Sequence, residues 1–119
     1  MSFSFEKLDV YSKAIDYADK VYKISKNFPD SEIYGLTSQI RRAAVSISSN
    51  IAEGSGRFHR KEFIQYLRIA RSSLYESVAL MEISFRQSYV SKLNYNELII
   101  LSNELAKMIN GLINSLDKR

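Results

Sequence analysis

Apolar residues recur three and four positions apart along nearly the whole chain, and only four glycines and one proline interrupt this spacing. The spacing places the apolar side chains on one face of an α-helix, which has about 3.6 residues per turn. The strict alternation of apolar and polar residues that predicts a half-buried strand is missing from the sequence. The pattern therefore predicts an all-α protein.

The interruptions divide the chain into four predicted helices. The first covers residues 8–27, because Pro29 cannot continue a helix. The second follows Asp30 and Ser31, two residues of the types that cap helix N-termini, and ends at the glycines of residues 54–56. Gly35 is a candidate break in the first turn of this second helix.

The third predicted helix, residues 60–89, is the longest. The fourth opens at Asn94, because Asn94 and Glu97 have the spacing of a capping box. Connections of a few residues make neighbouring helices antiparallel, so we predict an antiparallel up-down-up-down four-helix bundle. The predicted core-facing residues are Val10, Ala14, Tyr17, Val21, Ile24, Phe28, Leu36, Ile40, Ala43, Ile47, Ile51, Phe63, Leu67, Ala70, Leu74, Val78, Met81, Phe85, Leu98, Leu101, Leu105, Met108, Leu112 and Leu116.

The size of the chain favours one domain covering residues 1–119. A chain of 119 residues can bury about two-thirds of the surface that its unfolded form exposes, so its core needs no disulfide or metal. The sequence contains no linker and no internal repeat. Its start lacks an apolar signal region, and its longest aliphatic run, residues 98–101, is far shorter than the roughly 20 residues that span a bilayer. We expect a cytoplasmic protein with no membrane contact.

The residues needed for common catalytic and metal sites are missing. His59 is the only histidine and the chain contains no cysteine, so neither a zinc site of usual type nor a bundle-core di-metal site can be assembled. The serines have no second histidine to act as a base. We therefore predict a non-enzymatic protein with no catalytic residues, no metal and no cofactor.

Two helices carry more apolar surface than one core-facing stripe requires. The extra residues are Tyr11, Ile15, Ala18 and Tyr22 in the first helix and Ile99, Ile100, Ile109 and Ile113 in the fourth. A wide core-facing arc within one compact bundle explains them, and so does burial between subunits, since monomers rarely expose large apolar patches. The pattern leaves both explanations open.

The positive charge of the chain is concentrated in its middle. Residues 41–71 hold seven cations against two carboxylates, a net charge of +5, whereas the residues on either side are close to neutral. The seven cations are Arg41, Arg42, Arg57, Arg60, Lys61, Arg68 and Arg71. Arginine suits bidentate contact with phosphate, and the rings of Phe58 and His59 can stack on unpaired bases. The alternative is that Arg41, Arg42, Arg68 and Arg71 pair with carboxylates inside the protein or across an interface, while the turn is merely solvated.

Asn50 and Glu53 lie next to the apolar stripe of the second helix rather than opposite it. Buried polar groups need hydrogen-bond partners, and the candidates by residue type are Arg42, Arg71, Ser46 and Ser73. We expect a structural polar network formed by Asn50, Glu53, Arg71 and Ser73.

One long motif resembles a known family. Residues 28–57 read FPDSEIYGLTSQIRRAAVSISSNIAEGSGR, and Lys61-Glu62-Phe63, Ile69-Ala70-Arg71, Ser73-Leu74 and Glu76 continue the pattern. The chain resembles the bacterial four-helix bundle proteins known as 23S rRNA intervening-sequence proteins. Ser72 stands where the family usually has glycine, and His59 stands where a serine would cap the third helix. The resemblance implies a homopentamer, similar to the basic accessory protein of diversity-generating retroelements.

Two functions remain open at this stage. The first is a non-enzymatic oligomer that is associated with RNA or DNA through a basic patch formed by Arg57, Arg60, Lys61 and Arg68, with Arg41 and Arg42 as further candidates. The second is a structural scaffold or adaptor that binds a protein partner and has no direct nucleic-acid role.

Overall fold

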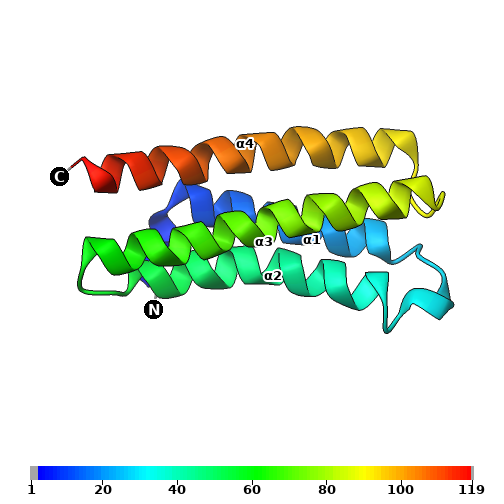
Figure 1. The fold of residues 1–119 in the computed structure, drawn as a ribbon, viewed down its shortest axis with the longest axis horizontal. Coiled ribbons are helices and arrows are strands. Elements are labelled where there is room, and N and C mark those ends of the chain that lie inside the picture. Colours follow the sequence, from blue (N-terminus) through cyan, green and yellow to red (C-terminus); the bar gives the residue numbers. More distant parts are fainter. Residues whose placement is uncertain (1–2, 119) are drawn as a thin grey trace.

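Four long helices lie side by side and alternate in direction along the chain, as Figure 1 shows. The structure is a computed structural model that describes residues 3–118, and within them it contains no strand. The elements are η1 (Ser4–Lys7), α1 (Asp9–Ser25), η2 (Asp30–Glu32), α2 (Leu36–Ser55), α3 (Arg60–Arg86) and α4 (Lys92–Asp117). The predicted antiparallel up-down-up-down bundle is confirmed.

The connection between α1 and α2 is longer than the sequence predicts, because α2 begins at Leu36 and not directly after Asp30 and Ser31, which form part of η2. α1 ends at Ser25, because the backbone N–H groups of Asn27 and Phe28 bond to carbonyls three residues back and turn the chain before Pro29. Gly35 is the N-cap of α2, so the helix begins after it. The carboxylate of Glu32 accepts a bond from the Leu36 backbone N–H at 3.2 Å and thereby takes the place of a capping side chain.

α3 ends three residues before its predicted end, in a motif that usually contains glycine. Ser88 has a positive φ of 66°. The Ser88 N–H bonds to the Phe85 carbonyl and the Tyr89 N–H bonds to the Ser84 carbonyl, each at 2.9 Å. These two bonds form a Schellman motif with serine at the left-handed position.

The predicted start of α4 at Asn94 is wrong. The helix begins at Lys92, and the Ser91 side chain caps it by accepting a bond from the Asn94 backbone N–H at 3.1 Å. The earlier start lets the Tyr95 ring stack on Phe85 with 4.5 Å between the ring centres. This contact with α3 favours Ser91 over Asn94 as the cap.

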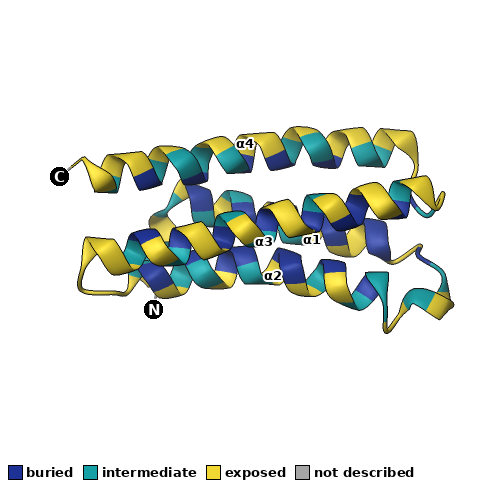
Figure 2. Cartoon of the chain, in the orientation of Figure 1, coloured by how far each residue is buried: buried dark blue, intermediate teal, exposed yellow. Residues whose placement is uncertain are grey.

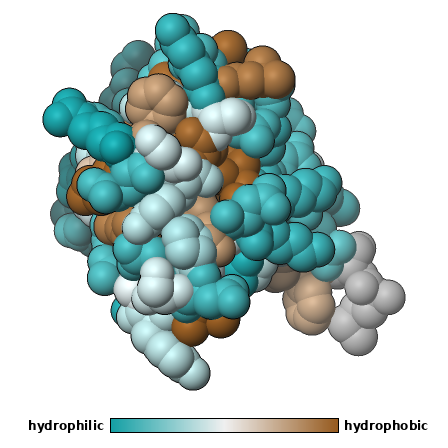
Figure 3. Space-filling view, turned by 90° about the vertical axis from the view of Figure 1, so that its right-hand side faces the viewer, coloured by the Kyte–Doolittle hydropathy of each residue, from teal (hydrophilic) through white to brown (hydrophobic). Residues whose placement is uncertain are grey.

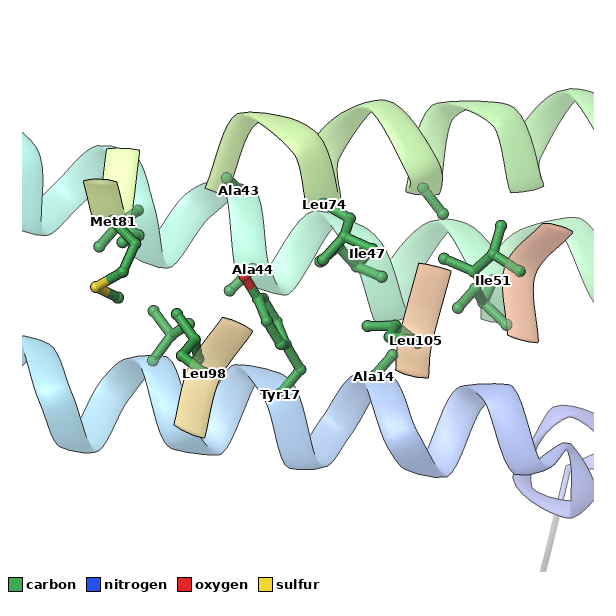
Figure 4. Close-up of a cluster of buried hydrophobic side chains, with 14 of the residues drawn as sticks. Ala14, Tyr17, Ala43, Ala44, Ile47, Ile51, Leu74, Met81, Leu98 and Leu105 are labelled. Atoms are coloured by element: carbon green, nitrogen blue, oxygen red, sulfur yellow. The ribbon is translucent and has the colours of Figure 1, made fainter. Parts of the chain in front are cut away.

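The core lies along the axis of the bundle and receives side chains from all four helices (Figures 2 and 4). At its centre the Tyr17 hydroxyl lies 2.7 Å from the Ser77 hydroxyl. Burial raises the pKa of Tyr17 to about 12, although the bond to Ser77 lowers it. Figure 4 shows Tyr17 reaching from α1 toward the small residue Ala44.

The predicted core face is confirmed in α1 and shifted in α3 and α4. The six core-facing residues predicted in the first helical segment are all buried. In α3 and α4, Ile64, Leu80, Ile109 and Ile113 are buried, whereas seven predicted core residues are only half-buried. These seven are Phe63, Val78, Phe85, Leu101, Met108, Leu112 and Leu116. These helices contact more than one neighbour, so their apolar arcs are wider than one stripe.

Part of the additional apolar surface is covered within the chain. Ile109 and Ile113 belong to the core, and Tyr11 and Ala18 pack against it. Ile15, Tyr22 and Ile100 are exposed. A wide core-facing arc therefore explains some of the additional apolar residues. The others remain exposed to solvent.

Candidate nucleic-acid interface

The seven cations of residues 41–71 do not form one continuous patch. Arg41 and Arg42 lie in the first half of α2, whereas Arg60 and Lys61 open α3 beyond the far end of α2. The 14 helical steps from Arg41 to Ser55 span about 21 Å at 1.5 Å per step. Figure 1 shows the α2–α3 turn at the end of the bundle opposite to the α1–α2 connection. The cations therefore divide into two groups.

Arg57 is held by its own chain. Its guanidinium donates to Glu53 Oε1 at 2.9 Å and to the Tyr66 hydroxyl at 2.6 Å, and it lies 4.9 Å from the centre of the Tyr66 ring. These contacts connect the end of α2 to the second turn of α3. Arg57 therefore stabilises the turn, and its charge is partly balanced by Glu53.

Arg60, Lys61 and Arg68 form what we call the end cluster. All three are exposed, and within residues 3–118 no carboxylate lies within ion-pair distance of them. They surround two adjoining surface hollows of about 220 Å³ and about 150 Å³, where the start of α3 meets the end of α4. Asp117 lines both hollows without forming an ion pair. The end cluster is therefore a local excess of positive charge.

An aromatic side chain stands beside the end cluster. Phe58 is 94% exposed, and its ring meets the His59 ring edge to face at 5.0 Å. His59 is the N-cap of α3 and makes no side-chain capping bond. Exposed rings next to unpaired cations are the combination with which proteins hold single-stranded nucleic acid.

The other group contains Arg41 and Arg42. The Arg41 guanidinium lies 4.7 Å from the centre of the Tyr22 ring, and its Nε donates to Ser25 Oγ at 2.8 Å. Arg42 is exposed and donates to Ser38 Oγ at 3.3 Å. Neither residue forms an ion pair with a carboxylate among residues 3–118. The expectation that these two arginines pair with carboxylates inside the protein is therefore wrong for residues 3–118, and pairing across an interface stays a prediction.

The expected polar network contains some of the predicted residues. Asn50 Nδ2 donates to the backbone carbonyl of Ser46 at 2.7 Å and to Ser46 Oγ at 3.0 Å. Ser46 Oγ in turn lies 2.9 Å from Ser73 Oγ of α3. Arg71 points elsewhere and donates to Asn110 Oδ1 of α4 at 2.8 Å. The predicted residues therefore form two separate polar contacts, one between α3 and α2 and one between α3 and α4.

Glu53 does not join this network, and the expectation that it is buried is wrong. Ser46, Asn50 and Gly54 are four residues apart and share the face of α2 that meets α3. Gly54 is buried because Tyr66 packs directly against it. A Cβ atom added at Gly54 would lie only 2.5 Å from Tyr66 Cβ. Glu53 is one residue earlier, about 100° around the helix, so its side chain reaches solvent.

Several contact residues had weak or no signals in the sequence. Tyr66 holds Arg57 only because of the shape of the α2–α3 turn. Tyr22 meets Arg41 across α1 and α2, so their contact depends on the register of the two helices. The position of Asp117 near Arg60 and Lys61 could have been predicted, because an antiparallel bundle brings the end of α4 to the start of α3.

The part of the chain that the structure describes shows no cluster of three or more His, Cys, Asp or Glu side chains with the arrangement of a metal site. No helix among the described residues is long and apolar enough to cross a membrane.

Comparison with known proteins gives a consistent result. No curated protein matches the chain significantly. A solved structure with a similar fold is a crystal structure of a protein with unknown function from the S23 ribosomal protein family of Bacteroides thetaiotaomicron. It has 27% sequence identity and a TM-score of 0.78, and the match covers 87% of this chain and 97% of that chain. The family model for the 23S rRNA-intervening sequence protein matches residues 6–111. With its motif, its four helices and this match in agreement, the chain belongs to the 23S rRNA-intervening sequence protein family.

Proposed function

We propose that this protein is a non-enzymatic, oligomeric bundle that binds single-stranded RNA at the α2–α3 end. One observation carries the proposal: Arg60, Lys61 and Arg68 lack ion-pair partners among residues 3–118 and lie beside the exposed Phe58 ring. The three cations contact backbone phosphates, and Phe58 stacks on an unpaired base.

The physical chemistry of the cluster favours a flexible single strand over a duplex. Phe58 projects from a turn, and a base can reach its ring only if that base is unstacked. Three phosphate contacts to a single strand give a slope of log affinity against log salt of about −2. Binding is therefore expected to be moderate and strongly weakened by salt.

Fluorescence anisotropy with a labelled single-stranded RNA of about 12 nucleotides tests this proposal. The triple variant Arg60→Gln, Lys61→Gln, Arg68→Gln is expected to lose most of the affinity and the salt dependence. A control variant, Arg86→Gln, Lys92→Gln, Lys107→Gln, removes the same charge from exposed positions elsewhere and is expected to bind like the wild type. An equal loss of RNA affinity in both variants would show that only the net charge of the protein matters. That result would contradict a binding site at the end cluster.

The role of Phe58 has its own test. Phe58→Ala is expected to weaken RNA binding about fivefold or more, because stacking on one base contributes about 1–3 kcal/mol. Phe58→Trp keeps a flat ring and is expected to retain the affinity. Unchanged binding by Phe58→Ala would show that phosphate contacts alone account for the affinity. It would contradict the proposed preference for single strands.

The oligomer is supported by apolar surface that the chain leaves uncovered. A surface hollow of about 340 Å³ between α3 and α4 is lined mainly by apolar side chains, among them Tyr75, Val78 and Ile99. Tyr75 is 56% exposed. Figure 3 shows further hydrophobic patches among hydrophilic residues at the end that carries the α1–α2 connection. We propose a homo-oligomer, and the family resemblance makes a pentamer the expected stoichiometry.

The same hollow also suits the second candidate function, a scaffold that binds a protein partner. Tyr75→Glu separates the two uses when native mass is measured by light scattering. A drop to monomer mass would assign the hollow to the subunit interface, whereas an unchanged oligomer would leave it free for a partner. A wild type that is itself monomeric would contradict the proposed assembly.

A further inference from the structure

A second group of cations surrounds a hollow near the other end of the bundle. This hollow has a volume of about 410 Å³ and is lined by Asp19, Tyr22, Lys23, Lys26 and Arg41. We propose that it is a binding site for a phosphate group, with the Arg41 guanidinium as its main ligand. The proposal does not depend on RNA binding at the end cluster.

Arg41 is held in place by two contacts that leave its outer nitrogens unused. Its guanidinium stacks on the Tyr22 ring at 4.7 Å, and its Nε donates to Ser25 Oγ at 2.8 Å. Ser25 is only 2% exposed, and its hydroxyl donates in turn to the Tyr22 carbonyl at 3.2 Å. Among residues 3–118 the two terminal nitrogens of Arg41 have no hydrogen-bond partner. The guanidinium is therefore positioned before any ligand arrives.

The charges around the hollow favour an anion. Asp19 is balanced by Lys23, whose Nζ lies 2.9 Å from Asp19 Oδ2. Within residues 3–118 no carboxylate is within ion-pair distance of Lys26 or Arg41. A smaller hollow of about 120 Å³ shares Lys26 and Arg41 with the first and is also lined by Asp30. The charged residues that line the two hollows therefore carry a net positive charge.

The shape of the donors favours phosphate among possible anions. The outer edge of a guanidinium presents two parallel N–H groups, which bind two oxygens of one phosphate. The remaining phosphate oxygens are then free to face the Lys26 ammonium. A carboxylate has only two oxygens, so it has none left for Lys26 once the guanidinium binds both. A volume of about 410 Å³ also lies in the range of small-molecule sites. The same chemistry fits pyrophosphate, the phosphate of a nucleotide and the backbone of RNA.

Titration of ¹⁵N-labelled protein with inorganic pyrophosphate, followed by NMR, tests the site. Saturable shifts are expected at the backbone amides of Tyr22, Ser25, Lys26 and Arg41, and chloride at equal ionic strength is expected to produce none. Arg41→Lys keeps the charge but loses the two parallel donors and the bond to Ser25, so it is expected to bind pyrophosphate at least about tenfold more weakly. Lys107→Gln, which removes an exposed charge from the second half of α4, is the control for net charge.

Two further variants separate ligand binding from folding. Tyr22→Phe keeps the ring under Arg41 and is expected to bind like the wild type, whereas Tyr22→Leu removes the ring and is expected to weaken binding. Thermal melting of each variant shows whether it is folded. Equal affinity of wild type and Arg41→Lys, or equal shifts with chloride, would overturn the proposal.

Adenosine monophosphate and the single-stranded RNA identify the source of the phosphate. The RNA titration uses the triple variant that lacks the end cluster, so any binding that Arg41→Lys then removes belongs to this hollow. Tight binding of adenosine monophosphate alone would assign the site to a free nucleotide. Failure of the end cluster to bind RNA would leave the pyrophosphate result unchanged, so the two proposals fail separately.

Discussion

The Tyr17 hydroxyl donates to Ser77 Oγ at 2.7 Å, and Ser77 Oγ–H donates to the Leu74 carbonyl at 2.8 Å, so α1 and α3 share one hydrogen-bond chain in the core. The two ends of this chain are not equivalent. Tyr17→Phe removes one bond and leaves Ser77 bonded to Leu74, which is expected to cost about 1 kcal/mol. Ser77→Ala leaves a buried tyrosine hydroxyl without a partner and is expected to cost about 1–3 kcal/mol. Urea unfolding of both variants gives the comparison, and a larger loss in Tyr17→Phe would contradict this account.

Tyr17 also makes stability depend on alkaline pH. Its pKa is raised to about 12 in the folded protein, chiefly by burial, whereas an unfolded tyrosine has a pKa of about 10. Between these values the unfolded chain loses a proton that the folded chain keeps, so this contribution to stability is complete below about pH 10 and falls as the pH rises toward 12.

The full contribution is on the order of 3 kcal/mol. The difference in unfolding free energy between wild type and Tyr17→Phe, measured from pH 8 to 11, isolates it from other groups that titrate. We expect the wild type to lose stability faster than the variant. Parallel curves would show that Tyr17 is not the cause.

Ser88 gives a direct route to higher stability. A residue other than glycine at a positive φ costs about 1–2 kcal/mol, and glycine removes that strain while losing more backbone freedom on folding. Ser88→Gly is therefore expected to raise the unfolding free energy by about 0.5–1 kcal/mol. Ser88→Ala keeps the strain and is expected to stay near the wild type in the same thermal or urea measurement. Stabilisation by both variants would point to the loss of the serine hydroxyl instead.

Gly54 and Gly111 form a matched pair of helical glycines with opposite expected effects. A Cβ atom at Gly54 would lie 2.5 Å from Tyr66 Cβ and 3.0 Å from Phe63 Cδ1, so Gly54→Ala must push α3 away and is expected to cost about 1–3 kcal/mol. At Gly111 a Cβ atom has nothing within 4 Å, and Gly111→Ala is expected to stabilise α4 by up to about 1 kcal/mol. Melting temperatures check both signs, and a tolerated Gly54→Ala would show that α2 and α3 can separate easily.

Asp117 offers a gain-of-function test of the end cluster. Its carboxylate lines the same hollows as the three cations and partly offsets their charge. Asp117→Asn is expected to raise RNA affinity about two- to fivefold, because an exposed pair of charges contributes less than about 1 kcal/mol. Anisotropy measured beside Asp16→Asn, an exposed carboxylate in the middle of α1, separates the local effect from net charge. Equal gains in both variants would contradict a local role.

The fold was predictable from the spacing of apolar residues, whereas four helix ends were not: the end of α1, the start of α2, the end of α3 and the start of α4. Every predicted core residue of the first helical segment is buried, because α1 presents one clear stripe. The end of α3 depends on Ser88 adopting a conformation that favours glycine, so its residue type gave no stop signal. α4 begins after the Ser91 cap, although Asn94 and Glu97 offered a second capping pattern three residues later.

The candidate site was predictable as a region but not as individual contacts. Charge counting identified residues 41–71, and the proposed end cluster lies within them. Which arginines are already engaged depends on side chains brought in from elsewhere: Tyr66 for Arg57, Asn110 for Arg71 and Tyr22 for Arg41. Those contacts follow from helix register and turn shape, which apolar spacing does not specify.

The Glu32 carboxylate that caps α2 also accepts a bond from the Tyr89 hydroxyl at 3.1 Å. Burial and this carboxylate together raise the pKa of Tyr89. One side chain thus ties the α1–α2 connection to the turn between α3 and α4. The two helical hairpins are latched together at this end, and the latch lies at the opposite end from Arg60 and Lys61. Any splaying of the hairpins that leaves the latch closed therefore pivots near the Arg41 hollow and produces its largest displacement at the end that carries Arg60 and Lys61.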